Sequence, residues 1–311
     1  MRPWLFRLGE TDIHSYYVFL TLGFIAAILL GWRECKRAGL DVAPFLELSF
    51  VIVIAGIFGA RLMHVVAESM PHDFFYSATL HKGAPTAAEL VKKGATDVEK
   101  IAGYGEPIIK FYARFPAQIF YLWKGGMAFY GGLILATVSA IAFMLVRKMP
   151  VLKTSDIIGL GLPLGLFFGR IGCFLNGCCF GSETHGHLGI SFPRGSAAFA
   201  EMKNAGIVSN NASCTPPVLP AMLFEAAASL AIFLFLYFYA WPRKRFDGQV
   251  VMLFGIFYSV CRFVIEFIRN DNRGVYFGGA ISSSQIVSLA VFIFSITAYL
   301  ILRQRHASHT A

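Results

Sequence analysis

The sequence predicts an all-α integral membrane protein with about seven transmembrane helices, an outer cap and an interfacial arm. Of its 311 residues, 56% are hydrophobic and 14% are charged, whereas a soluble protein carries about 25% charged residues. The apolar residues form long stretches that approach the roughly 20 residues a helix needs to cross a bilayer. Basic residues punctuate these stretches, so we attribute the net charge of +9 to membrane orientation and expect no nucleic-acid partner.

Seven stretches are apolar and long enough to be spans. They are expected near Tyr17–Gly31, Pro44–Val66, Met127–Val146, Ile157–Leu175, Val218–Ala240, Val250–Ile268 and Ile281–Leu302. The first is the shortest. It does not resemble a cleaved signal peptide, because little basic sequence precedes it and no small-residue cleavage site follows it.

Basic clusters predict the orientation of the spans, since they fall on alternate connections. The clusters are Arg33, Lys36 and Arg37 after the first span, Arg147, Lys148 and Lys153 after the third, Arg243, Lys244 and Arg245 after the fifth, and Arg303 and Arg305 after the seventh. The positive-inside rule assigns these connections to the cytoplasm. The N-terminus is therefore expected outside and the C-terminus inside.

Two long connections are predicted on the outer side of one transmembrane domain that covers residues 1–311. Residues 67–126 form the arm, in which aromatic, Lys and Arg residues interleave. This pattern fits an interfacial helix on lipid head groups, and equally an aromatic belt that leads into the third span. Residues 176–217 are rich in Gly, Ser, Asn and Pro, which predicts a small irregular cap.

Charged residues inside two spans predict a functional site. Arg170 follows an apolar run, and Arg262, Glu266 and Arg269 lie at i, i+4 and i+7, which places them on one helical stripe. Tyr258 lies one turn earlier on the same stripe. A charged side chain at the centre of a bilayer costs about 2.5–3.5 kcal/mol on insertion scales, so such residues usually face a polar cavity.

The charge balance favours an anion site over a purely structural Arg–Glu pair between helices. With Arg61 and Arg170 included, positive charges outnumber nearby acids on the outer half. The planar guanidinium of arginine suits phosphate through paired hydrogen bonds. Gly131, Gly132 and Gly177 lie near the outer surface, where a glycine permits close helix contact or lets backbone approach a ligand. Both uses stay open.

The cysteines of the cap predict a disulfide. Cys214 is expected to pair with Cys178 or Cys179, because the outer compartment permits disulfides and the segment has little core of its own. A metal site that adds the His-x-His at 185–187 is the weaker interpretation, since its spacing matches no known metal motif. A catalytic thiol at Cys178 or Cys173 is a further alternative.

Seven segments occur in the order typical of one enzyme family and cover nearly the whole chain. They are His14-Ser15-Tyr16, Gly59-Ala60-Arg61, Gly125–Gly132, Gly169–Gly181, Pro220 with Leu223 and Glu225, Arg262–Arg269, and Ser284-Gln285. On these segments the chain resembles the prolipoprotein diacylglyceryl transferases. The resemblance implies transfer of the diacylglyceryl group of phosphatidylglycerol to the lipobox cysteine of a prolipoprotein signal peptide, in the bacterial inner membrane, with release of glycerol phosphate. It implies no metal or soluble cofactor.

The resemblance also implies roles for single residues. Arg170 and Arg262 would hold the phosphate and stabilise the leaving group, Glu266 would orient Arg262, and Tyr16 and Gly181 match positions on which the family depends. The predicted catalytic positions are Arg170, Arg262, Tyr130 and Glu266. The predicted substrate-binding positions are Tyr16, Arg61, Gly131, Gly132, Asn176, Gly181, Tyr258 and Arg269.

Four departures from the family pattern remove its usual candidate bases. Tyr130 stands for a histidine, Cys173 for an asparagine, Cys178 for a glutamate, and Leu219–Met222 for a His-Pro-x-Gln segment. A tyrosine hydroxyl is a poor base at neutral pH without help. Two alternatives therefore remain beside the transferase. One is a divergent homologue that uses the same lipid donor with another acceptor, and the other is a non-catalytic lipid-binding membrane protein.

Overall fold

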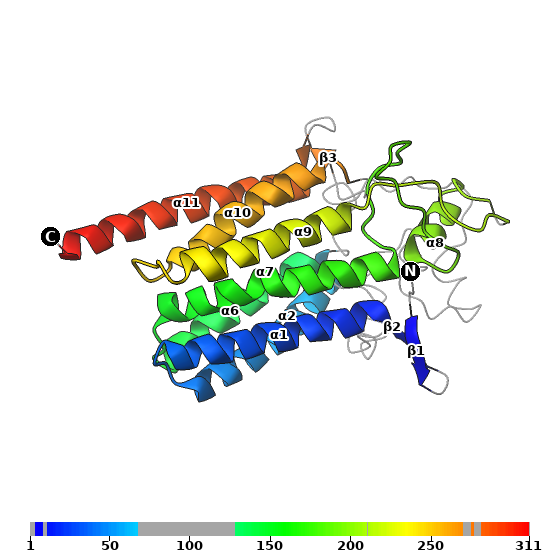
Figure 1. The fold of residues 1–311 in the computed structure, drawn as a ribbon. Helices are drawn as coiled ribbons and strands as arrows, with labels where there is room; N and C mark the ends of the chain where they lie inside the picture. Colours follow the sequence, from blue (N-terminus) through cyan, green and yellow to red (C-terminus); the bar gives the residue numbers. More distant parts are fainter. Residues whose placement is uncertain are drawn as a thin grey trace. The chain divides into compact units, whose positions relative to one another are not determined.

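The structure is a computed structural model that describes residues 4–8, 11–67, 128–209, 211–269, 275–276 and 281–310. In these residues seven helices are long and apolar enough to cross a membrane. They are α1 (Ser15–Arg37), α2 (Val42–Ala67), α6 (Phe129–Val146), α7 (Val151–Asn176), α9 (Ala221–Leu234) with its π-helical continuation η3 (Phe235–Ala240), α10 (Gln249–Glu266) and α11 (Ser283–Thr310) (Figure 1). The predicted all-α membrane fold with seven spans is confirmed.

The remaining described elements are short. Strands β1 (Trp4–Leu8) and β2 (Thr11–His14) form one antiparallel pair before α1. Strands β3 (Val275–Tyr276) and β4 (Ile281–Ser282) form a second pair before α11. Helix α8 (Ala197–Asn204) lies between α7 and α9.

Three helices extend well beyond the predicted apolar stretches, for the same physical reason. Helix α1 continues past Gly31 through Arg37, α7 begins at Val151 rather than near Ile157, and α11 continues past Leu302 through Thr310. The added turns carry charged residues, which lower local hydropathy but not helix propensity. Long basic side chains at such ends extend toward the polar interface.

The described residues form two compact units. The first comprises residues 1–42 and 152–311, and the second comprises residues 43–151. The single transmembrane domain stays a prediction. The predicted arm at 67–126, apart from its first residue, lies outside the described residues.

In the second unit, α2 and α6 pack through glycines. A Cβ atom on Gly131 would overlap the carbonyl oxygen of Gly59 and the side chain of Met63, and one on Gly132 would lie 2.8 Å from the carbonyl oxygen of Gly56. The two backbones thus approach as closely as small residues permit in membrane helices. The contact supports the packing interpretation of Gly131 and Gly132.

In the first unit, α7 packs against α1 and α10, again through small residues. Gly161 of α7 lies against Ala27 of α1, and Gly159 lies against Val251 of α10. Figure 1 shows α7 beside α1 and α9, with α10 and α11 adjacent to each other. The arrangement brings the ends of α7, α9 and α10 together.

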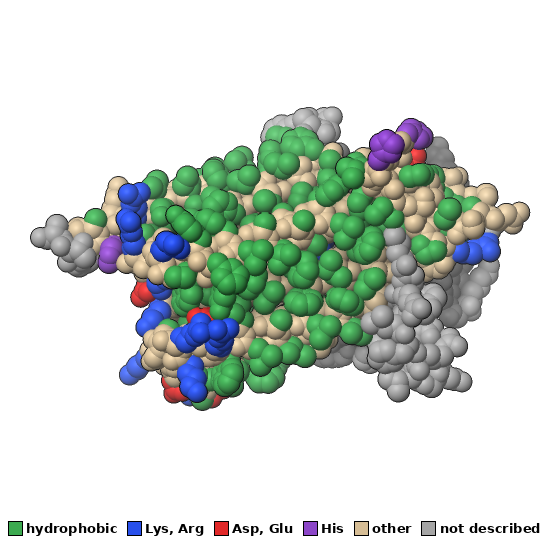
Figure 2. Space-filling view, in the orientation of Figure 1, with side chains coloured by type: hydrophobic (Ala, Val, Ile, Leu, Met, Phe, Trp, Pro, Cys, Tyr) green, Lys and Arg blue, Asp and Glu red, His purple; other side chains and the backbone are tan. Residues whose placement is uncertain are grey.

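One buried carboxylate holds the start of α10. Asp156 of α7 accepts hydrogen bonds from the backbone N–H groups of Gly248, Val250 and Val251 at 2.8–2.9 Å, and pairs with Lys244 at 2.9 Å. Its side chain is 0% exposed. Asp156 therefore satisfies the first N–H groups of α10, which a helix cannot pair internally. Figure 2 shows Lys and Arg side chains gathered at one end of the helices and apolar side chains along their flanks.

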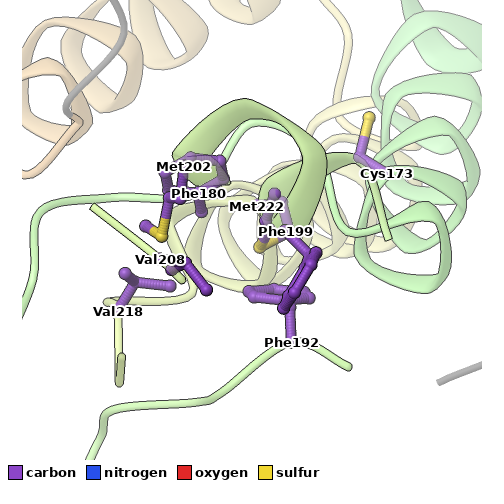
Figure 3. Close-up of a cluster of buried hydrophobic side chains, with 9 residues drawn as sticks. Cys173, Phe180, Phe192, Phe199, Met202, Val208, Val218 and Met222 are labelled. Atoms are coloured by element: carbon purple, nitrogen blue, oxygen red, sulfur yellow. The ribbon is translucent and has the colours of Figure 1, made fainter. Parts of the chain in front are cut away.

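The segment between α7 and α9, predicted as a cap, has an apolar core of its own. Ser196 caps α8 by accepting a hydrogen bond from the backbone N–H of Phe199. The core consists of Cys173, Phe180, Phe192, Ala198, Phe199, Met202, Val208, Val218 and Met222 (Figure 3). Cys173 and Met222 belong to α7 and α9, so the core fastens the segment to both helices.

The predicted disulfide is wrong. All six cysteines are free, and Cys214 is exposed. Cys178 and Cys179 instead lie close to Cys173. The reasoning failed because the segment is stabilised by buried aromatic and aliphatic side chains, and so does not depend on a bridge.

Candidate functional site

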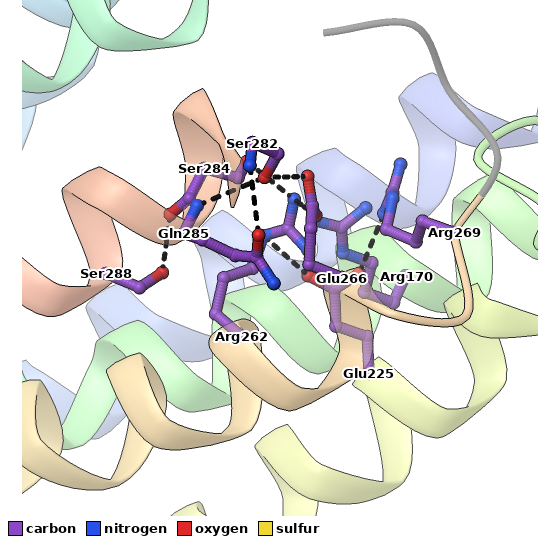
Figure 4. Close-up of polar contacts among 9 residues, drawn as sticks. All are labelled: Arg170, Glu225, Arg262, Glu266, Arg269, Ser282, Ser284, Gln285 and Ser288. Carbon is purple, nitrogen blue, oxygen red and sulfur yellow. Dashed lines mark hydrogen bonds and ion pairs between the residues drawn. The ribbon is translucent and has the colours of Figure 1, made fainter. Parts of the chain in front are cut away.

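Five charged side chains meet where three helices of the first unit end (Figure 4). Arg170 comes from the last turns of α7, Glu225 from the second turn of α9, and Arg262 and Glu266 from the end of α10. Arg269 follows α10 directly. Charged side chains from three separate helices thus converge. The spacing of residues along the sequence does not indicate this convergence.

Glu225 is the centre of this cluster. Its Oε1 lies 2.8 Å from Nη2 of Arg170 and 3.9 Å from Nε of Arg262. Its Oε2 lies 3.1 Å from Nη1 of Arg269. The glutamate side chain is 3% exposed, and that of Arg269 is 2% exposed. A buried carboxylate needs such partners, because desolvation of an unpaired charge costs several kcal/mol.

Arg262 is held from two sides. Its Nη2 lies 2.6 Å from Oε2 of Glu266, and it donates a hydrogen bond of 2.8 Å to Oγ of Ser284. Ser282 in turn donates to Oε1 of Glu266 at 2.8 Å. The i, i+4 contact between Arg262 and Glu266 is present, as predicted from the spacing.

One buried donor in the cluster lacks a hydrogen-bond partner among the described residues. Nη1 of Arg262 is buried and forms no hydrogen bond with any residue that the structure describes. Three arginines and two glutamates give the cluster a charge of 3 − 2 = +1. A buried, unpaired N–H and a surplus positive charge together fit an anion, and a phosphate oxygen accepts such a bond well.

Gly181 positions the third arginine. It forms an antiparallel bridge with Arg269, and the neighbouring N–H of Ser182 donates to the carbonyl oxygen of Ile268 at 3.0 Å. A Cβ atom at position 181 would overlap that carbonyl oxygen and would lie 3.0 Å from Cβ of Leu219. Only glycine allows this close approach, so the predicted importance of Gly181 has a steric cause.

Tyr16 and Asn176 lie at a group of cysteines beside the arginines. Tyr16 of α1 interacts electrostatically with Arg170 and with Cys173, Cys178 and Cys179. The side chain of Asn176 forms a hydrogen bond with Cys178. The pKa of the Cys179 thiol is lowered by hydrogen bonds from Cys173 and Cys178 and then by the positive charges of Arg170 and Arg269.

The other predicted site residues divide between the two units. Tyr258 of α10 shares a hydrogen bond with Arg170 and lies near Glu225. Arg61 and Tyr130 belong to α2 and α6 of the second unit with the two packed glycines, and Arg61 is 3% exposed. Their roles stay predictions.

No role was predicted from the sequence for Glu225 or for the serines that hold Arg262 and Glu266. Glu225 is the only charged residue between positions 218 and 240. A lone carboxylate in an apolar span needs a cationic partner, by the same reasoning that singled out Arg170. The sequence therefore contained a signal for the importance of Glu225. Ser284 was marked by the family resemblance alone, and Ser282 had no signal, because serines are ordinary at the start of a helix.

Comparison with known proteins gives one consistent result. A model of the family described as prolipoprotein diacylglyceryl transferase matches residues 3–95 and 101–301. The phosphatidylglycerol–prolipoprotein diacylglyceryl transferase 2 of Clostridium perfringens is 29% identical over 96% of this chain and 94% of its own length. The phosphatidylglycerol–prolipoprotein diacylglyceryl transferase of Clostridium tetani is 26% identical over 98% of this chain and 99% of its own length. That of Geobacter sulfurreducens is 26% identical over 97% of this chain and 96% of its own length.

Proposed function

The chain belongs to the prolipoprotein diacylglyceryl transferase family, and from this premise we propose that it transfers the diacylglyceryl group of phosphatidylglycerol to a prolipoprotein cysteine. The observation that carries the proposal is the cationic cluster of Arg170, Arg262 and Arg269, with the unpaired Nη1 of Arg262. The protein is a multi-pass membrane protein. We place it in the bacterial cytoplasmic membrane with the N-terminus outside, on the alternation of basic connections.

In the proposed reaction the acceptor sulfur attacks the glyceryl carbon that carries the phosphate. The carbon–oxygen bond breaks, and its electron pair stays on the phosphate, so glycerol phosphate leaves with one more negative charge than the phosphodiester had. Arg170 and Arg262 hold this phosphate, and Glu225 and Glu266 keep their guanidinium groups in place. Preorganised donors in a site with little water stabilise developing charge without reorganisation.

The acceptor thiol must lose a proton, and the family's usual bases are replaced here. The hydroxyl of Tyr130 is one proposed acceptor of that proton. The alternative is that the positive charges near the site favour the thiolate directly. Tyr130→Phe tests the first route: a large fall in rate implicates the hydroxyl, and a small one shows that the hydroxyl is not the main proton acceptor.

The decisive assay incubates purified protein with labelled phosphatidylglycerol and a lipobox peptide. We expect a thioether-linked peptide and glycerol phosphate in equal amounts. Arg262→Ala should lower the rate by about 10²–10³-fold, the usual effect of removing a donor to a developing anion. Arg303→Ala is the control, because Arg303 is an exposed residue near the C-terminus that should leave the rate unchanged.

Absence of both products from the wild-type protein would contradict the transferase. Glycerol phosphate without a modified peptide would favour the second candidate, a transferase with another acceptor. The replacement of the family's usual bases supports this candidate. Bound lipid without glycerol phosphate would favour a lipid-binding protein.

A further inference from the structure

Three cysteine side chains meet where α7 ends, and the reaction described above leaves them without a role. Cys173 lies on the last turns of α7, and Cys178 and Cys179 follow the end of the helix. Their Sγ atoms all lie within 4.8 Å of one another. Cys173 is buried and the other two are half-buried, so the cluster is shielded from bulk water and still partly accessible.

The backbone after α7 turns the later thiols back onto the helix. Gly177 has a φ of +73°, and the N–H groups of Gly177 and Cys178 both donate to the carbonyl oxygen of Cys173. This pattern ends a helix with a left-handed residue. Cys179 also has a left-handed φ, of +63°, which residues other than glycine adopt only at a cost in free energy. The chain thus accepts strain at the position that brings a third thiol to the other two.

We propose that Cys173, Cys178 and Cys179 bind one zinc ion through their three sulfur atoms. Thiolates are ligands that zinc prefers. Zn–S bonds are about 2.3 Å long, so sulfurs around one ion lie about 3.8 Å apart. The present separations, within 4.8 Å, exceed that spacing by about 1 Å at most. The histidines at 185 and 187 are exposed and are not part of the cluster.

Three protein ligands leave the fourth position of a tetrahedral zinc ion open, as in zinc sites that act on a substrate. On the basis of the proposed function, this position takes the thiol of the acceptor cysteine. Coordination releases the thiol proton to water and holds the sulfur as a thiolate. The thiolate attacks the glyceryl carbon, and the electron pair of the broken carbon–oxygen bond leaves with the phosphate. Zinc keeps its charge, and neither oxidant nor reductant is needed.

The surroundings of the cluster suit this role. Arg170 and Arg269 both interact electrostatically with Cys179, so the proposed nucleophile lies near Arg170, one of the two arginines proposed to hold the phosphate. Cys173 and Cys178 also stand where the family pattern has asparagine and glutamate. Zinc would thus supply the activation of the thiol that those replacements remove.

The test measures the zinc content of the full-length protein, purified in detergent with a reductant and supplied with zinc. We expect one zinc ion per chain in the wild type and in Cys214→Ser, since Cys214 is exposed and outside the cluster. Cys179→Gly should lower zinc affinity by about 100-fold or more, beyond the usual effect of a change next to a ligand. It should still fold, because glycine adopts a left-handed backbone freely. Thermal unfolding of both proteins in a chelator checks this.

Cobalt(II) in place of zinc reports on the ligands. We expect sulfur-to-cobalt charge-transfer absorption in the wild type and its loss in Cys179→Gly. A lipobox peptide should change the spectrum, and the same peptide with serine in place of cysteine should not. A wild-type protein that binds no zinc, a Cys179→Gly variant that binds it equally well, or a disulfide between two of the three cysteines would overturn the zinc site.

The experiments distinguish failure of the zinc site, failure of its role in activating the thiol, and failure of the proposed transferase function. A cobalt spectrum that ignores the peptide thiol would overturn the role of zinc in activation. Zinc-loaded protein that binds cobalt as expected but releases no glycerol phosphate would contradict the proposed function and support the metal site, because metal content does not depend on turnover.

Discussion

Glu225→Gln removes the one negative charge to which three guanidinium groups are held. Arg170, Arg262 and Arg269 lie 2.8, 3.9 and 3.1 Å from its carboxylate oxygens. The change raises the charge of the five-residue cluster from 3 − 2 = +1 to 3 − 1 = +2. Breaking a buried ion pair costs about 3–5 kcal/mol, since the remaining charge stays desolvated. We expect a loss of that size in the free energy of unfolding, and a fall on the order of 10 °C in the unfolding midpoint.

The assay is thermal unfolding in detergent, followed by tryptophan fluorescence, with a matched glutamine substitution as control. Glu47 also pairs with an arginine, Arg147, but the two side chains are 50% and 44% exposed. An exposed pair contributes about 0–1 kcal/mol, because water and salt screen it. Glu47→Gln should therefore shift the midpoint by only a few degrees, roughly 2–4 °C at most.

An anionic lipid gives a second readout. The surplus positive charge in Glu225→Gln should be partly neutralised by phosphatidylglycerol, so this lipid should raise the midpoint of the variant more than that of the wild type. Phosphatidylcholine should not. A midpoint for Glu225→Gln no lower than that of Glu47→Gln would refute the reasoning, because the carboxylate would then not be holding buried charges.

Three further expectations follow from particular contacts. Gly181→Ala should destabilise the protein by about 1–3 kcal/mol, because the added Cβ overlaps the carbonyl oxygen of Ile268. It should also lower the rate of glycerol phosphate release by displacing Arg269. An unchanged release rate would show that the backbone bridge between Gly181 and Arg269 does not position Arg269. Asp156→Ala leaves the N–H groups at the start of α10 without their acceptor, so the unfolding midpoint should fall. The folded protein should keep its rate of glycerol phosphate release, because Asp156 lies about 20 Å along α7 from Arg170. An unchanged midpoint would contradict the capping role of Asp156. Lys36→Cys in a variant whose other cysteines are replaced by serine should resist an impermeant thiol reagent in intact cells and react after lysis, and rapid labelling in intact cells would overturn the predicted orientation.

The helices could be predicted because membrane spans are local features of the chain. A run of apolar residues long enough to cross the hydrocarbon must pair its own backbone groups, and a helix is the structure that does so within one segment. The contact between Arg262 and Glu266 was predictable for the same reason, since residues four apart are neighbours on any helix. The ends of α1, α7 and α11 were misplaced, where charged residues continue a helix past its apolar part.

The site required contacts between segments far apart in the chain. The sequence by itself marked Arg170 and Arg262 as costly inside a membrane, and it contained Glu225 as a lone carboxylate. Only the tertiary structure decided that one buried glutamate faces three arginines, because that depends on how α7, α9 and α10 pack.

The cysteines show the limit most clearly. Their positions in the sequence favoured a bridge from Cys178 or Cys179 to Cys214, on the premise that the segment lacked a core. The fold supplies that core with Phe192 and its neighbours, and Gly177 turns the chain back so that the two thiols meet Cys173 instead. Local sequence patterns identify the groups that the chain must shelter from lipid. Which of them face one another was decided by helix packing and by one left-handed turn, whose effects no local pattern records.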